Sequence, residues 1–150
     1  MNKKKIAYLQ FPGSNTENET KNILQKHGMA PFGHFWNDAP ELLNKYDGYI
    51  ILGGFSFEDR SRSGIIASLE PVMNELKKQA LLGKPILGIC NGAQILVESG
   101  IVPGNQDFQT LVSLTDNKRM IGSRIVGTGY YNKWCYICLL YTSPSPRDTG

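Results

Sequence analysis

The sequence of 150 residues has few cysteines, no long apolar run and little net charge. Its three cysteines, Cys90, Cys135 and Cys138, are too few and odd in number for a secreted disulfide scaffold, which favours a reducing cytoplasm. No apolar run approaches the roughly 20 residues that cross a bilayer, and the run at 6–11 is too short for the core of a signal peptide. A net charge of +3 is too small to indicate nucleic-acid binding. We therefore expect a cytoplasmic protein with neither a membrane nor a nucleic acid as partner.

Short apolar runs alternate with amphipathic stretches over the first 100 residues. The runs at 6–11, 32–36, 47–52 and 86–89 predict strands, and the stretches at 16–28, 62–82 and 92–99 predict helices. Strands with little internal alternation, separated by helices, are typical of a parallel sheet covered on both faces. We therefore predict an α/β fold, a parallel sheet flanked by helices with right-handed crossovers.

The pattern changes after residue 104. Residues 110–114, 124–126 and 133–137 predict three further strands, arranged antiparallel. The length suits one domain, which we place at 1–137. Residues 138–150 lose both periodicity and core residues and resemble the in-frame translation of a sequencing adapter. We interpret them as a non-native tail, excluded from the fold.

The predicted sheet brings three glycine-containing loops to one edge. The loops lie at 11–15, 53–55 and 90–92, and each follows a predicted strand. Parallel sheets place their chemistry at the carboxyl ends of their strands. This edge is therefore the expected position of a functional site.

Gly88-Ile89-Cys90-Asn91-Gly92 is the strongest local signal. A strand runs directly into a helix, with a cysteine at the corner and a glycine two residues to either side, which is the arrangement of a nucleophile elbow. A helix N-terminus favours negative charge, which suits a cysteine that reacts as its thiolate. The N–H of Asn91 is then placed to stabilise the oxyanion of a tetrahedral intermediate.

A second oxyanion donor must come from another loop, and Gly53-Gly54 is the candidate. Gln94 lies one helical turn beyond Cys90 on the same face, so it is a candidate for substrate contact. Most free cysteines are small buried hydrophobes, and a Gly-Gly pair alone is most often a plain turn. The glycines around Cys90 make a nucleophile the better interpretation.

Three blocks of sequence together carry a resemblance to a known family. They are 11–15 (FPGSN), 53–64 (GGFSFEDRSRSG) and 83–94 (GKPILGICNGAQ). They closely resemble the glutamine amidotransferase subunit of phosphoribosylformylglycinamidine synthase, a class I triad amidotransferase of purine biosynthesis. The resemblance covers about 5–137, and one departure is Leu52, where the family usually has proline.

The resemblance implies a flavodoxin-like class I amidotransferase fold and glutaminase activity. The nucleophile, here Cys90, attacks the side-chain amide of glutamine, releases ammonia and forms a thioester that water hydrolyses. The backbone N–H groups of Gly54 and Asn91 are implied to form the oxyanion hole. Substrate-binding residues are implied at Gly53, Phe55 and Gln94. Asp59, Arg60 and Arg62 either shape the glutamine site or the subunit interface, or form a solvated charge cluster.

The same resemblance implies partners. Ammonia passes to a larger synthetase subunit, which uses ATP and magnesium, and a small accessory subunit completes the complex. The glutaminase subunit itself is expected to hold no metal or other cofactor. The single pair Cys135-x-x-Cys138 is weak evidence for a zinc site, because two further ligands are lacking.

A cysteine nucleophile of this class also needs a histidine base and an acid that orients it. In the family, a His and a Glu far beyond the elbow fill these roles. This sequence has only His27 and His34, both upstream of Cys90. His27 is expected to end a helix and His34 to lie in a strand, so neither is expected to be the base. We therefore expect a fragment that lacks the triad His and Glu and is inactive alone.

Two other interpretations remain open on the residues alone. One is another cysteine-elbow α/β protein, protease-like or glyoxalase-like, which needs neither the Gly-Gly-Phe-Ser block nor glutamine. The other is a non-catalytic flavodoxin-like binding module whose glycine loops cradle a phosphate, although the sequence has no P-loop or dinucleotide fingerprint.

The assignment of residues 138–150 as a tail leads to a stability prediction. The segment contains two X-Pro bonds and few apolar residues after Tyr141, so burial cannot offset the roughly 1–2 kcal/mol per residue of backbone ordering entropy. We expect a chain that ends at Ile137 to keep the melting temperature of the full chain in differential scanning calorimetry. A clear drop in the melting temperature of the shortened chain would show that the segment is native structure.

Overall fold

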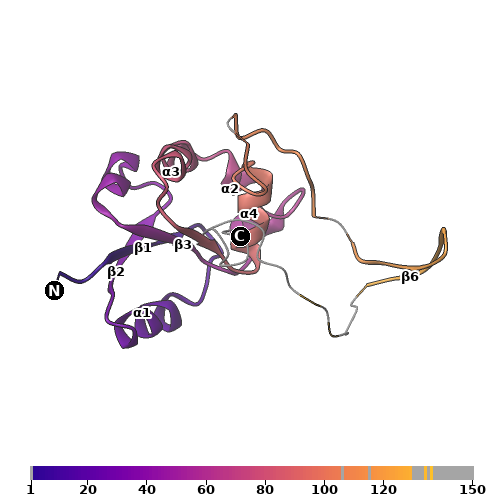
Figure 1. Cartoon of the computed structure of the whole chain (residues 1–150), viewed down its shortest axis with the longest axis horizontal. Helices are drawn as coiled ribbons and strands as arrows, with labels where there is room; N and C mark the ends of the chain where they lie inside the picture. Colours follow the sequence, from indigo (N-terminus) through magenta and orange to yellow (C-terminus); the bar gives the residue numbers. More distant parts are fainter. Residues whose placement is uncertain (1, 106, 115, 130–133, 135, 137–150) are drawn as a thin grey trace, which may run out of the picture. The chain divides into compact units, whose positions relative to one another are not determined.

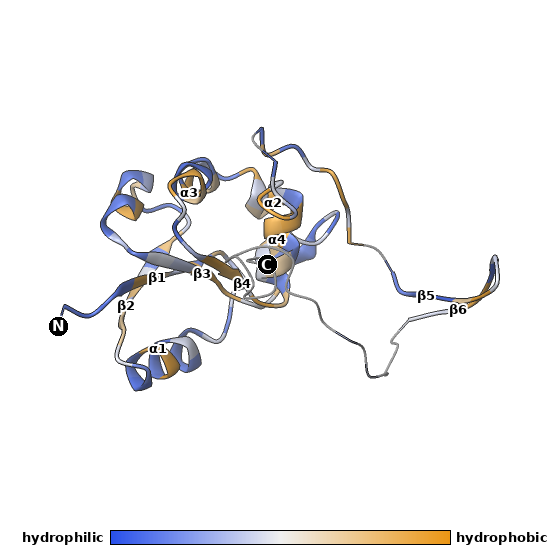
Figure 2. Cartoon of the chain, viewed as in Figure 1, coloured by the Kyte–Doolittle hydropathy of each residue, from blue (hydrophilic) through white to orange (hydrophobic). Residues whose placement is uncertain are grey.

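The computed structural model describes residues 2–105, 107–114, 116–129, 134 and 136. The chain divides after Leu114 into two compact units. The first unit contains a four-stranded parallel sheet in the order β2-β1-β3-β4 (Figure 1; β4 is labelled in Figure 2). The elements of this unit, with η for 3-10 helices, are β1 (Lys5–Gln10), α1 (Glu17–Lys26), β2 (Ala30–Phe35), η1 (Pro40–Lys45), β3 (Gly48–Ile51), η2 (Ser56–Asp59), α2 (Ile65–Ser68), α3 (Pro71–Leu81), β4 (Ile86–Gly88) and α4 (Asn91–Glu98).

The side chains of the two central strands alternate between the two faces of the sheet. Ala7, Leu9 and Ile51 belong to the larger core cluster, which also contains buried residues of α2, α3 and α4. Ile50 and Leu52 belong to a smaller cluster with Leu24 of α1. Figure 1 shows α1 and α3 on opposite sides of the sheet, and Figure 2 shows a short hydrophobic stretch on the otherwise hydrophilic α1. The predicted parallel sheet flanked by helices is confirmed.

The helix predicted at 62–82 is wrong in one respect, because it is two helices. Helix α2 ends at Ser68 and α3 begins at Pro71. Proline disfavours helical angles at the residue before it, and Glu70 is accordingly extended, with φ −66° and ψ 145°. The interruption separates a short helix near the site from a long helix that covers the sheet.

The predictions after residue 104 are only partly confirmed. The second unit contains an antiparallel pair, β5 (Lys118–Ile121) and β6 (Arg124–Thr128), and β6 confirms the strand predicted at 124–126. The strand predicted at 110–114 is absent, and half-exposed apolar side chains such as Leu111 and Val112 alone do not make one. The strand predicted at 133–137, the boundary at 137 and the tail at 138–150 lie outside the described residues.

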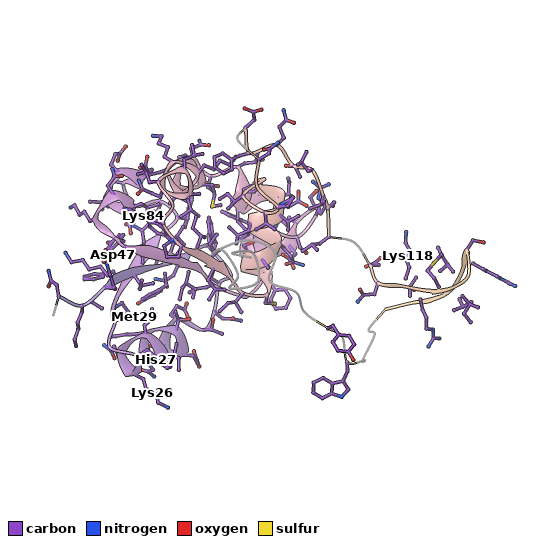
Figure 3. The ribbon with its side chains drawn as sticks, viewed as in Figure 1. Lys26, His27, Met29, Asp47, Lys84 and Lys118 are labelled. Carbon is purple, nitrogen blue, oxygen red and sulfur yellow. The ribbon has the colours of Figure 1, made fainter. Side chains whose placement is uncertain are left out.

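A buried polar cluster ties η1 to α3 at the amino end of the sheet. The hydroxyl of Tyr49 donates a hydrogen bond of 2.7 Å to the carbonyl of Leu43 and lies 3.3 Å from Gln79 Oε1. Burial, with a smaller contribution from the Glu75 carboxylate, raises the pKa of Tyr49 to about 12. Lys84, which lies near Asp47 at this end of the sheet (Figure 3), places its Nζ 3.4 Å from the same hydroxyl. The loops that follow β1, β3 and β4 lie at the opposite, carboxyl end of the sheet.

The loop that follows β3 has an unusual backbone. Four residues other than glycine take positive φ values within it: Phe57 (52°), Glu58 (58°), Asp59 (49°) and Ser61 (67°). Such angles are costly for residues with a Cβ, and they persist only when surrounding contacts hold them. Phe57 supplies one such contact, because its ring packs 5.7 Å from that of Trp36 and 6.4 Å from that of Phe11.

Among the described residues, no helix is long and apolar enough to cross a membrane.

Glu58 provides a test of this backbone strain. We expect Glu58→Gly to raise the free energy of unfolding by about 1 kcal/mol, because glycine adopts positive φ without steric cost. The matched control is Glu19→Gly, at an exposed position inside α1, which we expect to lower it by up to about 1 kcal/mol. Urea denaturation measures both. Equal destabilisation by the two substitutions would show that Glu58 is not strained.

His34 makes stability depend on pH. Its side chain is 1% exposed and its Nε2 has no hydrogen-bond partner among the described residues. Burial lowers the pKa of His34, although the Asp38 carboxylate opposes this. The unfolded chain therefore binds a proton more readily than the folded chain, so the contribution of His34 is present above the unfolded pKa of about 6.5 and is lost as the pH falls through the folded pKa.

We therefore expect the free energy of unfolding to decrease as the pH is lowered from about 7.5 to about 5, and His34→Gln to flatten this decrease. The control is His27→Gln, at an exposed position at the end of α1, which should leave it unchanged. Urea titrations at several pH values measure the slopes. Parallel slopes in the wild-type chain and His34→Gln would contradict the assignment.

Candidate functional site

Cys90 lies at the corner between β4 and α4. Its backbone angles, φ 54° and ψ −112°, are outside the regions that residues with a Cβ usually adopt. The side chain is exposed. The predicted strand-to-helix corner is confirmed, and it presents a thiol to solvent at the N-terminus of a helix of eight residues.

The two flanking glycines allow this corner to form. A Cβ on Gly88 would lie 2.6 Å from the carbonyl oxygen of Gly92, and a Cβ on Gly92 would lie 2.2 Å from that of Ile51. Both distances are shorter than any real Cβ contact. The start of α4 is therefore packed directly on the backbone of β3, and any larger residue would push the thiol away from the sheet edge.

The loops after β1 and β3 meet beside the corner. Gly54 forms an isolated antiparallel bridge with Ser14. The N–H of Asn15 donates to the carbonyl of Gly53, and the N–H of Phe55 donates to that of Gly13, both at 2.9 Å. Gly54 has φ 127°, and a Cβ on it would clash with the Gly13 carbonyl oxygen. Only glycine fits this position.

Gly53 brings this loop pair to the thiol. A Cβ built on Gly53 would lie 3.5 Å from the Cβ of Cys90. The predicted proximity of the Gly-Gly pair to Cys90 is therefore confirmed for Gly53. Phe55 is 66% exposed and Gln94 is half-buried, so both are open to a ligand.

The backbone N–H groups of this corner and of the loop beside it differ in their hydrogen bonding. Within the described part of the chain, the N–H groups of Gly54 and Asn91 donate no hydrogen bond, whereas those of Phe55 and Gly92 are both engaged. Free donors beside a nucleophile are what an oxyanion hole requires. Chemically, the corner combines a thiol that can attack a carbonyl carbon with donors for the negative charge that develops on its oxygen.

The side chain of Asn91 has a role that the sequence did not indicate. It is 2% exposed and makes three hydrogen bonds. Its Oδ1 accepts from the N–H of Ser56 at 3.0 Å, and its Nδ2 donates to Asp59 Oδ1 at 3.2 Å and to Gln94 Oε1 at 2.9 Å. One amide thus joins the loop after β3 to the first turn of α4.

A second tie holds the far end of the same loop. Arg62 pairs with the buried carboxylate of Glu98 through two hydrogen bonds of 2.5 Å. Hydrogen bonding to this carboxylate raises the pKa of Arg62. In contrast, Arg60 pairs with Glu58 where both side chains are about three-quarters exposed. The charge cluster is therefore mixed: Asp59 and Arg62 fasten the loop, and Arg60 is solvated.

A cavity of about 350 Å³ lies beside this loop. It is lined by Pro12, Gly13, Phe57, Glu58, Arg60 and Ile66. Cys90 is not among the residues that line it, although Gly13 lines it and also accepts a hydrogen bond from the N–H of Phe55.

Neither histidine takes part in the site. His27 caps the C-terminal end of α1 and is exposed, and His34 is buried in β2 with its ring 6.5 Å from that of Tyr46. Neither forms a hydrogen bond with Cys90 in the described structure. Among the described residues, no group of three or more His, Cys, Asp or Glu side chains is placed to hold a metal ion.

Comparison with known proteins places the chain in a family. Residues 3–132 match the family model of the CobB/CobQ-like glutamine amidotransferase domain. The chain is 48% identical over 130 residues to phosphoribosylformylglycinamidine synthase subunit PurQ of Methanothrix thermoacetophila, covering 87% of this chain and 49% of that protein. It is 39% identical over 133 residues to the subunit of the same name from Staphylococcus saprophyticus, covering 86% and 58%.

The fold has a matching solved structure. A chain in the structure of PurLQS from Thermotoga maritima superposes with a TM-score of 0.61 at 36% identity, covering 66% of this chain and 45% of that chain. The chain thus spans about half the length of the relatives it matches. The resemblance carried by the three sequence blocks is confirmed, and the protease-like, glyoxalase-like and flavodoxin-like interpretations are not favoured. Because the family model matches residues 3–132 of the 150, the chain belongs to the CobB/CobQ-like glutamine amidotransferase family.

Proposed function

We propose that this chain carries the nucleophile half of a glutaminase that supplies ammonia to phosphoribosylformylglycinamidine synthase. The observation that carries the proposal is the exposed thiol of Cys90 at a strained corner, together with the N–H groups of Gly54 and Asn91, which donate no hydrogen bond within the described part of the chain. The names of the two PurQ relatives support the substrate and the pathway of this proposal.

The proposed reaction begins with attack of the Cys90 sulfur on the side-chain amide carbon of glutamine. The amide oxygen becomes an oxyanion, which the N–H groups of Gly54 and Asn91 stabilise. Collapse of the tetrahedral intermediate breaks the carbon–nitrogen bond, and the amine leaves as ammonia after it takes up a proton. Water then attacks the thioester, releases glutamate and restores the thiol.

Proton transfer in these steps requires a base that the known part of the site does not provide. The thiol must lose a proton and the leaving amine must gain one, and a histidine usually does both. No histidine follows Cys90 in this sequence. A triad His and Glu are therefore expected only from the resemblance to the family. We propose that the described site forms the bond between Cys90 and the substrate but does not complete repeated turnovers efficiently.

The partners belong to the same proposal. The Thermotoga maritima structure is named for a PurLQS assembly, which supports a complex with a synthetase subunit and a small accessory subunit. ATP and magnesium are proposed to act in the synthetase, and no cofactor is proposed for this chain. A cytoplasmic location follows from the proposed biosynthetic role.

Labelling with a glutamine analogue tests the proposed nucleophile and its substrate. We expect 6-diazo-5-oxo-L-norleucine to form one adduct on Cys90, L-glutamine to slow its formation, and Cys90→Ala to abolish it. L-Glutamate at the same concentration is the control, because it lacks the amide. Peptide mapping by mass spectrometry locates the adduct. Absence of the adduct, or equal protection by glutamate, would contradict the proposal.

Turnover is expected to be near background. Removal of triad members in comparable enzymes lowers the rate by about 10⁴–10⁶, so ammonia release from glutamine should be hard to detect. Iodoacetamide should nevertheless modify Cys90 faster than Cys135 or Cys138 in the folded chain, and all three alike in urea. Robust ammonia release that Cys90→Ala abolishes would show that the chain contains a base after all.

A further inference from the structure

The side chain of Asn91 fixes the orientation of the Gln94 side-chain amide, that is, the positions of its oxygen and its nitrogen. The N–H of Ser56 is a backbone donor, so the atom of Asn91 that faces it at 3.0 Å must be the acceptor Oδ1. The other end of the Asn91 amide is then the donor Nδ2. Its two neighbours, Asp59 Oδ1 and Gln94 Oε1, are both acceptors, which is consistent with this assignment.

The consequence for Gln94 is a defined polarity. Because Oε1 of Gln94 accepts from Asn91 Nδ2 at 2.9 Å, the opposite end of the Gln94 amide is Nε2, which carries two donors and no acceptor. Gln94 is half-buried, and its Nε2 makes no hydrogen bond among the described residues. Gln94 therefore offers N–H donors beside the elbow and cannot turn over without losing its bond to Asn91.

We propose that Asn91 is a positioning residue that holds the amide of Gln94 with its NH₂ group toward the substrate, where it donates to a substrate oxygen. This inference rests on the proposed function, since it assigns Gln94 to glutamine. The chain of contacts starts at the Ser56 N–H and runs through Asn91 to Gln94. Asn91 thus has two proposed roles: its backbone N–H stabilises the oxyanion, and its side-chain amide orients Gln94.

Asn91→Asp inverts the polarity without changing the shape. One carboxylate oxygen still accepts from the Ser56 N–H, but the other no longer donates. Gln94 must then present Nε2 to this second carboxylate oxygen and Oε1 to the substrate, so two acceptors face each other.

We expect the inhibition constant of Asn91→Asp for 6-diazo-5-oxo-L-norleucine to rise by roughly tenfold or more, as for one lost hydrogen bond with an unpaired partner. The iodoacetamide rate at Cys90 reports separately how the new carboxylate affects the thiol, and we expect it to fall by less than the inhibition constant rises.

A double substitution, Asn91→Asp with Asp59→Asn, separates the effect of Asn91 on the orientation of Gln94 from its effect on the stability of the loop after β3. Asn91→Asp also opposes two carboxylates, since Asp59 Oδ1 lies 3.2 Å away. Adding Asp59→Asn restores a donor–acceptor pair between these positions, so the melting temperature should recover toward that of the wild-type chain. The orientation of Gln94 is not restored, so the raised inhibition constant should persist. Val97→Ala is the control for a loss of packing in α4 away from the loop, and it should lower stability and leave the inhibition constant unchanged.

The experiment measures the inhibition constant and the maximal labelling rate for the analogue, the iodoacetamide rate and the melting temperature of each full-length variant. An unchanged inhibition constant in Asn91→Asp, or its recovery in the double variant, would overturn the inference and leave the proposed function standing. If Asn91→Asp fails to fold, the double variant alone decides. Failure of the wild-type chain to form a glutamine-protected adduct would overturn the proposed function, and this inference with it.

Discussion

The close approach of α4 to β3 is the constraint on which the site depends. Gly92 lies so near the Ile51 carbonyl that no other residue fits, and Gly88 is packed in the same way against Gly92. Because the helix starts against the sheet, Cys90 is held at positive φ with its thiol at the sheet edge. At the first residue of this helix, the Asn91 N–H donates no hydrogen bond to any residue that the structure describes. The close packing of Gly92 on Ile51 therefore fixes the positions of both the nucleophile and one of the two proposed oxyanion donors.

The loop after β3 extends this rigid arrangement along the helix. The side chain of Asn91 fastens the loop at the first turn of α4, and the ion pair between Arg62 and Glu98 fastens it at the last turn. Between them, residues with positive φ remain in strained conformations because both ends are held. Strain of this kind is found where geometry must be fixed before a ligand binds. A loop fixed in advance spares the site the entropy of ordering it during the reaction.

Sequence patterns predicted the sheet and the elbow because both rest on local signals. Apolar runs mark β1, β3 and β4, and glycines on either side of Cys90 mark the corner. The break at Pro71 was missed although proline carries the signal, because the helical spacing of apolar residues continues across it. The Asn91 network was missed for another reason. Its partners Ser56 and Asp59 are 35 and 32 residues away in sequence, and no periodicity reports such a contact.

A structure of the chain after reaction with 6-diazo-5-oxo-L-norleucine would show whether Gly54 and Asn91 form the oxyanion hole. We expect a bond from the Cys90 sulfur to the analogue, with the oxygen of the adduct about 3 Å from the backbone nitrogens of both Gly54 and Asn91. An adduct whose oxygen points to solvent, with both N–H groups unengaged, would contradict the assignment of these two residues as the oxyanion hole.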